Sequence, residues 1–120
     1  MKGINMREFE TGATRDDNDD KVDWEGFFSP LVFDAFGQYM HKHRKQKDGK
    51  LRDSDNWQKG MPLSVYMKSG WRHFFAWWWC HRGHGGKAFL VESLVALMFN
   101  VMGYLHEILK EKQCKPKDGA

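Results

Sequence analysis

The chain has 120 residues, of which 41% are apolar and 15% are aromatic. This length suits one domain with a hydrophobic core, and the apolar content excludes a wholly disordered protein. Nineteen Lys and Arg residues against sixteen Asp and Glu give a net charge of +3, too small to indicate nucleic-acid binding by itself. The two cysteines exclude a disulfide framework, so we expect a reducing, cytoplasmic setting.

No uninterrupted apolar segment is long enough to predict a membrane span. The longest, from Phe74 to Cys80, falls far short of the roughly 18 residues that a spanning helix needs. The first residues, Met1 to Asn5, lead into charged residues without the apolar stretch of a signal peptide. We therefore expect no membrane partner.

Residues 1–28 are predicted to form an irregular N-terminal arm. The acidic run from Asp16 to Asp20 has neither helical nor strand periodicity, and no β-hairpin pattern is persuasive anywhere in the chain. Trp24, Phe27 and Phe28 then bring back large apolar side chains. We expect these side chains to dock the arm on the rest of the protein.

The helical body is predicted over residues 29–112 and begins with a strong helix start. Ser29 can cap the first helix, and Pro30 suits its first position. Apolar residues at helical spacing carry this helix to about Lys47. The polar, turn-rich residues 48–60 then predict one long ordered loop.

Two further helices follow the loop. The second runs from Pro62 to about Arg82, where a group of glycines ends it, and the third spans about Lys87 to Lys112. Residues 113–120 are predicted to be a disordered tail. The fold class is therefore all-α: one domain built as a small three-helix bundle, with an extended N-terminal arm and one long ordered loop.

Three consecutive tryptophans, Trp77 to Trp79, lie on the second predicted helix. Successive helical residues point about 100° apart, so the three rings cannot all enter one core. At least one ring is expected to face a partner subunit, the arm or a ligand. A homo-oligomer is the simpler of these explanations.

Polar residues on the two long helices are the first candidates for a site. Glu92 and Asn100 lie eight residues apart on one face of an otherwise apolar helix, which predicts a metal or polar-ligand site or, alternatively, the edge of the bundle. Arg72 and His73 could hold a phosphate, or could be a surface arginine beside a core histidine. The short glycine-rich connection makes these helices antiparallel, so we expect the two groups to face one another.

A basic run between Lys42 and Arg52 could bind phosphate groups, but aspartates interrupt it and a solvated surface explains it equally well. Nucleic acid is therefore not the expected partner. No P-loop and no nucleophile elbow is present in the sequence.

Five segments together resemble one protein family over about residues 11–110. They are Thr11 to Ala13 with Arg15-Asp16, Lys21 to Asp23, Arg52 to Pro62, Ser69 to His73 with Trp77-Trp78, and Phe99 to Val101 with Gly103 to Glu107. The family is that of the dATP/dGTP diphosphohydrolase N-terminal domains, small proteins frequent in tailed-phage genomes. Its most specific elements match Asn56 to Pro62 and Arg72 to Trp78.

The resemblance implies a phage protein that acts on purine deoxynucleotides in the cytoplasm of the infected bacterium. It implies hydrolysis of dATP or dGTP to the monophosphate and pyrophosphate with Mg²⁺ or Mn²⁺. Glu92 and Asp23 are then the candidate metal ligands. The candidate nucleotide-binding residues are Arg15, Lys21, Asn56, Trp57, Lys59, Arg72, His73 and Asn100.

The helices lack the paired Glu-x-x-Glu and Glu-x-x-Asp patterns with which MazG-type pyrophosphohydrolases, the source of that chemistry, hold magnesium. A second function therefore stays open: a non-catalytic protein that sequesters a host nucleotide signal, such as a cyclic nucleotide, against host defence.

Overall fold

The structure is a computed structural model that describes residues 6–17 and 20–114. It is mostly helical, as predicted, but it also contains a small two-stranded sheet. In chain order the elements are β1 (Met6–Glu8), β2 (Thr14–Asp16), α1 (Trp24–Phe27), α2 (Pro30–Lys42), the 3₁₀ helix η1 (Asn56–Lys59), α3 (Leu63–His81) and α4 (Lys87–Cys114).

The prediction of a wholly irregular arm was wrong. β1 and β2 pair antiparallel, with Met6 opposite Asp16, and the turn between them uses the left-handed conformation of Gly12. The Nε atom of Arg7 donates to the Asp16 carbonyl oxygen at 3.1 Å. Strands this short carry too few alternating residues to stand out in a sequence.

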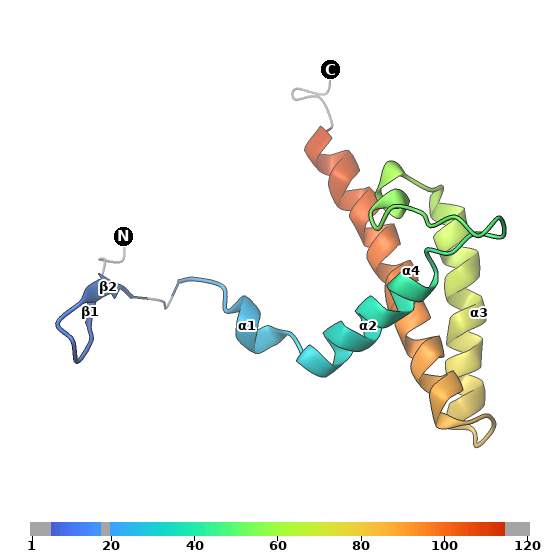
Figure 1. The fold of residues 1–120 in the computed structure, drawn as a ribbon, viewed down its shortest axis with the longest axis horizontal. Helices are drawn as coiled ribbons and strands as arrows, with labels where there is room; N and C mark the ends of the chain where they lie inside the picture. Colours follow the sequence, from blue (N-terminus) through green and yellow to red (C-terminus); the bar gives the residue numbers. More distant parts are fainter. Residues whose placement is uncertain (1–5, 18–19, 115–120) are drawn as a thin grey trace.

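The arm leads away from the helical body instead of docking on it (Figure 1). Trp24, Phe27 and Phe28, which were expected to make that contact, are all exposed. The side chain of Asp23 caps α1 by accepting from the Gly26 amide at 3.0 Å. The arm therefore presents aromatic side chains that its own chain leaves uncovered.

Helix α2 begins as predicted but ends earlier. The Ser29 hydroxyl accepts from the Val32 amide, and Pro30 is the first helical residue. The helix ends at Lys42 instead of about Lys47 because the chain turns into a tight loop around Gly49, where φ is 84°. The Gln46 amide donates to the Lys50 carbonyl oxygen across this turn.

The central unit is the antiparallel hairpin of α3 and α4, joined through residues 82–86. Gly83 and Gly85 both have positive φ and make this short connection possible. Among the described residues, the buried apolar side chains are Tyr66, Val95 and Ala96, all in this hairpin. The predicted helix bounds hold within about two residues here.

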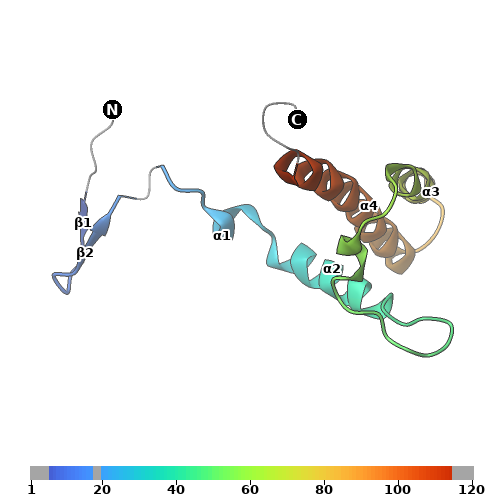
Figure 2. The ribbon, with the colours of Figure 1, turned by 90° about the horizontal axis from the view of Figure 1, so that it is seen from above.

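The second layer consists of α2 and the loop that follows it, and both lie on one side of the hairpin (Figure 2). The indole of Trp57, on η1, packs edge-on against Phe99 and His106 of α4, with ring centroids 5.9 and 4.9 Å apart. The long loop is therefore held on α4 by Trp57, and not on α3, the helix that follows the loop. The opposite side of the hairpin is not covered by the described part of the chain.

Between Lys87 and Glu111, helix α4 is also long and apolar enough to cross a membrane, by length and composition alone. Of its most apolar 18-residue stretch, 28% is buried. This stretch does not appear as an uninterrupted apolar run in the sequence, because Glu92 and Asn100 break it. A core helix of a soluble protein has the same length and composition, so this property alone does not distinguish the two environments.

The predicted tail, residues 113–120, lies largely outside the described residues. Helix α4 continues to Cys114, so the first two residues of the predicted tail, 113 and 114, are helical.

Candidate functional site: the three-helix cluster

Polar side chains from α2, α3 and α4 lie within electrostatic range of one another where α2 crosses α4. We call this group the three-helix cluster and define it as Tyr39, Lys42, His43, His73 and Glu92. The Nζ atom of Lys42 lies 3.3 Å from the Oε2 atom of Glu92, an ion pair between residues 50 positions apart. The ion pair thus joins the C-terminal end of α2 to the N-terminal part of α4.

The aromatic part of the cluster comes from α2. The rings of Tyr39 and His43, one helical turn apart, are tilted by 45° with centroids 4.3 Å apart. Burial raises the pKa of the Tyr39 hydroxyl, and the negative charge of Glu92 raises it further. Tyr39 therefore remains a neutral hydrogen-bond donor throughout the physiological pH range.

His73 enters the cluster from α3 and is half-buried. Burial lowers its pKa most, Arg72 and His43 lower it further, and Glu92 acts in the opposite direction. A histidine with a lowered pKa is neutral at pH 7 and can both donate and accept a hydrogen bond. The cluster thus carries the positive charge of Lys42, the negative charge of Glu92 and a neutral imidazole.

A groove of about 600 Å³ adjoins the cluster between α2 and α4. Ala35, Val91 and Val95 give it an apolar wall, while Lys42 and Lys87 provide two cationic groups. A concave surface with a few convergent polar groups is the usual form of a small-molecule site, and this groove falls in the common size range of roughly 300–1,000 Å³.

Three of the predicted site residues belong to the arm and lie away from this cluster. Arg15 is on β2, Lys21 precedes α1, and the carboxylate of Asp23 is engaged in capping α1. All three are exposed, and Figure 1 shows the arm extending away from the crossing of α2 and α4.

The loop residues Asn56, Trp57 and Lys59 lie further along α4, toward its C-terminal end. Lys59 is exposed, and the neighbouring backbone of Gln58 accepts from the Nζ atom of Lys110 at 3.5 Å. The ring of Trp57 packs on α4 and so supports the loop. These residues share a side of the hairpin with the cluster but are not part of it.

Asn100, a predicted ligand, is buried in the hairpin. Its Nδ2 atom donates to the Ala96 carbonyl oxygen at 2.8 Å, one turn earlier on α4. Arg72, which was expected to face Glu92 and Asn100 across the hairpin, is exposed. Of the predicted residues, the structure brings His73 and Glu92 into one cluster.

The two candidate metal ligands do not form a site within one chain. Glu92 is paired with Lys42, and Asp23 caps a helix in the arm. Within residues 6–17 and 20–111, no three His, Cys, Asp or Glu side chains are grouped so as to hold a metal ion. A Mg²⁺ or Mn²⁺ site made by Glu92 and Asp23 therefore stays a prediction that this arrangement does not support.

The sequence did not single out Tyr39, Lys42 or His43 as site residues. The available signal was the i, i+4 spacing of Tyr39 and His43. Lys42 was assigned to the basic run, and only the crossing of α2 over α4 shows that it belongs with Glu92.

Comparisons with family models, with curated proteins and with solved structures find no match to this chain. The resemblance to the phage diphosphohydrolase family thus stays a prediction.

Proposed function

We propose that this protein binds a purine deoxynucleotide, with its phosphates at the three-helix cluster. The observation that carries the proposal is the Lys42–Glu92 ion pair between α2 and α4, beside a groove of about 600 Å³ and with His73 of α3 within electrostatic range of Glu92. The resemblance supplies the purine and the phage setting, the cytoplasm of an infected bacterium. The predicted three-helix bundle is, in this proposal, the scaffold that holds the cluster together.

The charges around the groove favour an anionic ligand. Lys42 and Lys87 line it, Arg72 lies next to His73, and Glu92 is the one acidic residue among the residues that line it. A phosphate that replaces Glu92 as the partner of Lys42 exchanges one charge-assisted contact for another. The neutral imidazole of His73 can donate to a phosphate oxygen, and the rings of Tyr39 and His43 offer a surface for a base.

Binding without hydrolysis is the form of the proposal that the geometry favours. The cluster contains a single carboxylate, Glu92, which is paired with Lys42, and it lacks the paired acidic residues with which MazG-type pyrophosphohydrolases hold magnesium. A bound Mg²⁺ or Mn²⁺ would supply charge stabilisation at the phosphates, with Glu92 as its one protein ligand in the cluster. Sequestration of a host nucleotide signal therefore remains the second candidate function.

Titration calorimetry tests this proposal with dGTP, dATP and a panel of cyclic dinucleotides, each with and without magnesium or manganese. We expect saturable binding of a purine nucleotide, weakened at least about tenfold by Lys42→Ala because a charge-assisted phosphate contact is lost. Product analysis of the same samples distinguishes binding alone from release of pyrophosphate.

Lys68→Ala is the matched control, since Lys68 is an exposed lysine on α3 outside the cluster. The Lys42–Glu92 pair is itself largely exposed, so its loss should alter the melting temperature little. If the Lys42→Ala and Lys68→Ala variants bind nucleotide with equal affinity, the three-helix cluster is not part of the binding site.

A further inference from the structure

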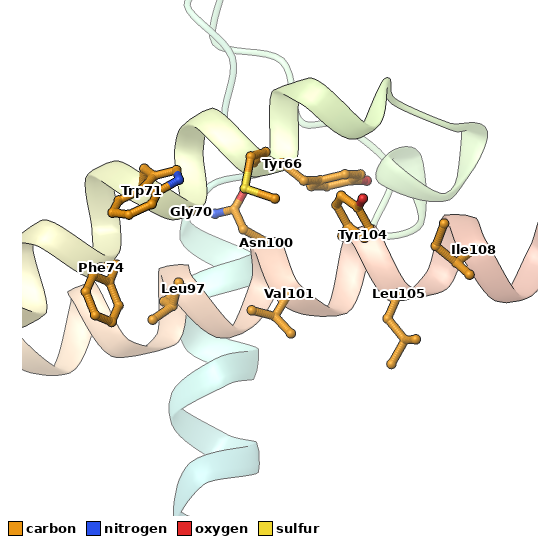
Figure 3. Close-up of a pocket in the computed structure, with 11 residues that line it drawn as sticks. Tyr66, Gly70, Trp71, Phe74, Leu97, Asn100, Val101, Tyr104, Leu105 and Ile108 are labelled. Carbon is orange, nitrogen blue, oxygen red and sulfur yellow. The ribbon is translucent and has the colours of Figure 1, made fainter.

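The side of the α3–α4 hairpin that faces away from α2 is a continuous apolar surface, which we call the bare face. It is formed by Met67, Trp71 and Phe74 of α3 with Val101, Leu105 and Ile108 of α4, and Figure 3 shows the labelled members along one side of the two helices. Trp71 is 66% exposed, Val101 60% and Leu105 53%. The bare face has a groove at its centre. None of the described residues that line this groove is Asp, Glu, Lys or Arg.

The chain's own second layer cannot cover this face. At about 3.6 residues per turn, the residues of α4 that meet α2, such as Glu92 and Val95, lie on roughly the opposite side of the helix from Val101 and Ile108. The loop held by Trp57 lies on the same side as α2, because it packs on Phe99 and His106.

We infer that the bare face packs against the same face of a second copy of this chain, so that two α3–α4 hairpins form a four-helix bundle. Two antiparallel helices that present one apolar side are half of such a bundle. A two-fold arrangement of this kind pairs one surface with itself and needs no other partner. This inference does not depend on nucleotide binding.

The exposed area suits a stable dimer. If a large side chain has about 150–250 Å², the exposed parts of the bare face together amount to roughly 500–800 Å². A standard protein interface buries about 800 Å² on each partner, and its centre is depleted in charged residues as this face is. By contrast, three buried apolar side chains among the described residues make a very small core for a chain of this length.

A lipid environment fits the face less well, although α4 alone could cross a membrane by length and composition. The short connection between α3 and α4 would force α3 into the bilayer beside it. Lys68 and Arg72 are exposed near the middle of α3 and would then face lipid without a partner from α4. A second copy covers the apolar face and leaves these charges in water.

Sedimentation equilibrium on the full chain, without detergent or nucleotide, tests the inference. We expect twice the 14.2 kDa monomer mass at tens of micromolar, and a shift to monomer in Leu105→Glu with its helical circular dichroism retained. Phe33→Glu is the matched control, because Phe33 is also exposed, at 71% against 53% for Leu105, but lies on α2, away from the bare face. Phe33→Glu should remain a dimer.

Hydroxyl-radical footprinting of the unmodified protein provides a second readout that does not depend on a variant folding. Met67 and Trp71 should become protected as concentration rises through the dimerisation range, while Trp24 should not. A strict monomer, a protein that requires detergent or sediments with lipid vesicles, or a dimer in which Met67 and Trp71 stay reactive would each overturn the inference. So would a dimer dissociated by Phe33→Glu and unaffected by Leu105→Glu.

Discussion

The aromatic ring of Tyr66 on α3 lies directly against the backbone of Gly103 on α4. A Cβ atom added at Gly103 would meet the Cε1 and Cζ atoms of this ring in overlap, and Tyr66 is 2% exposed, so the ring cannot move into solvent. The glycine therefore sets how closely the two helices approach. This contact accounts for a glycine in the interior of a long helix, where it otherwise costs stability.

Gly103→Ala should lower the free energy of unfolding by about 1–3 kcal/mol, because overpacking exceeds the gain of roughly 1 kcal/mol in helix propensity. Gly37→Ala is the control, since nothing lies within 4 Å of a Cβ at that position in α2. That change should raise stability by up to about 1 kcal/mol. Urea denaturation measures both, and a stabilised Gly103→Ala protein would show that the helices are not in close contact there.

Trp57 should act as the anchor of the long loop. Trp57→Ala removes the ring contacts with Phe99 and His106 and should cost about 1–3 kcal/mol, less than the roughly 3–5 kcal/mol of a fully buried tryptophan. Trypsin should then cleave sooner at Lys45 to Lys59. Leu51→Ala, at the exposed turn, should change stability by less than about 0.5 kcal/mol. Equal protease resistance of wild type and Trp57→Ala would mean that the loop is held by other contacts.

The lowered pKa of His73 predicts a dependence of stability on pH. Between this lowered pKa and the ordinary value of about 6.5, the unfolded chain binds the proton more readily than the folded protein. The free energy of unfolding should therefore be constant above that ordinary value and fall as the pH drops through the window. The groups that set the shift are Arg72, His43 and Glu92, together with burial.

Melting curves of His73→Gln across this pH range should show a shallower slope than wild type. His41→Gln, a change at an exposed histidine on α2, should keep the wild-type slope. If His73→Gln also keeps that slope, another group is responsible for the acid sensitivity.

The helices could be predicted from sequence because their signals are local. The cap at Ser29, the glycines after α3 and the apolar periodicity of α4 each act over a few residues. The end of α2 could not be placed, since the turn around Gly49 competes with the helix only once it closes on itself through the Gln46–Lys50 hydrogen bond.

The candidate site was predictable only in part, because its contacts depend on how the helices pack and not on local sequence. Glu92 and His73 stand out as polar residues on apolar helices, but Lys42 resembles any other member of a basic run. Its pairing with Glu92 depends on how α2 crosses α4, which is a tertiary property. The arm residues resemble a family motif, yet within one chain they lie apart from the cluster.

The most direct test of the proposed site is a nitrogen-detected NMR titration of the histidine rings with dGTP and with dATP, assigned with His→Gln variants. Phosphate at the three-helix cluster should shift the ring signals of His43 and His73 and raise the pKa of His73, because a nearby negative charge favours the imidazolium form. His84, which stacks on Trp79 at the end of α3, should not move. Unchanged His43 and His73 signals at saturating nucleotide in the folded protein would contradict the assignment of this cluster as the nucleotide site.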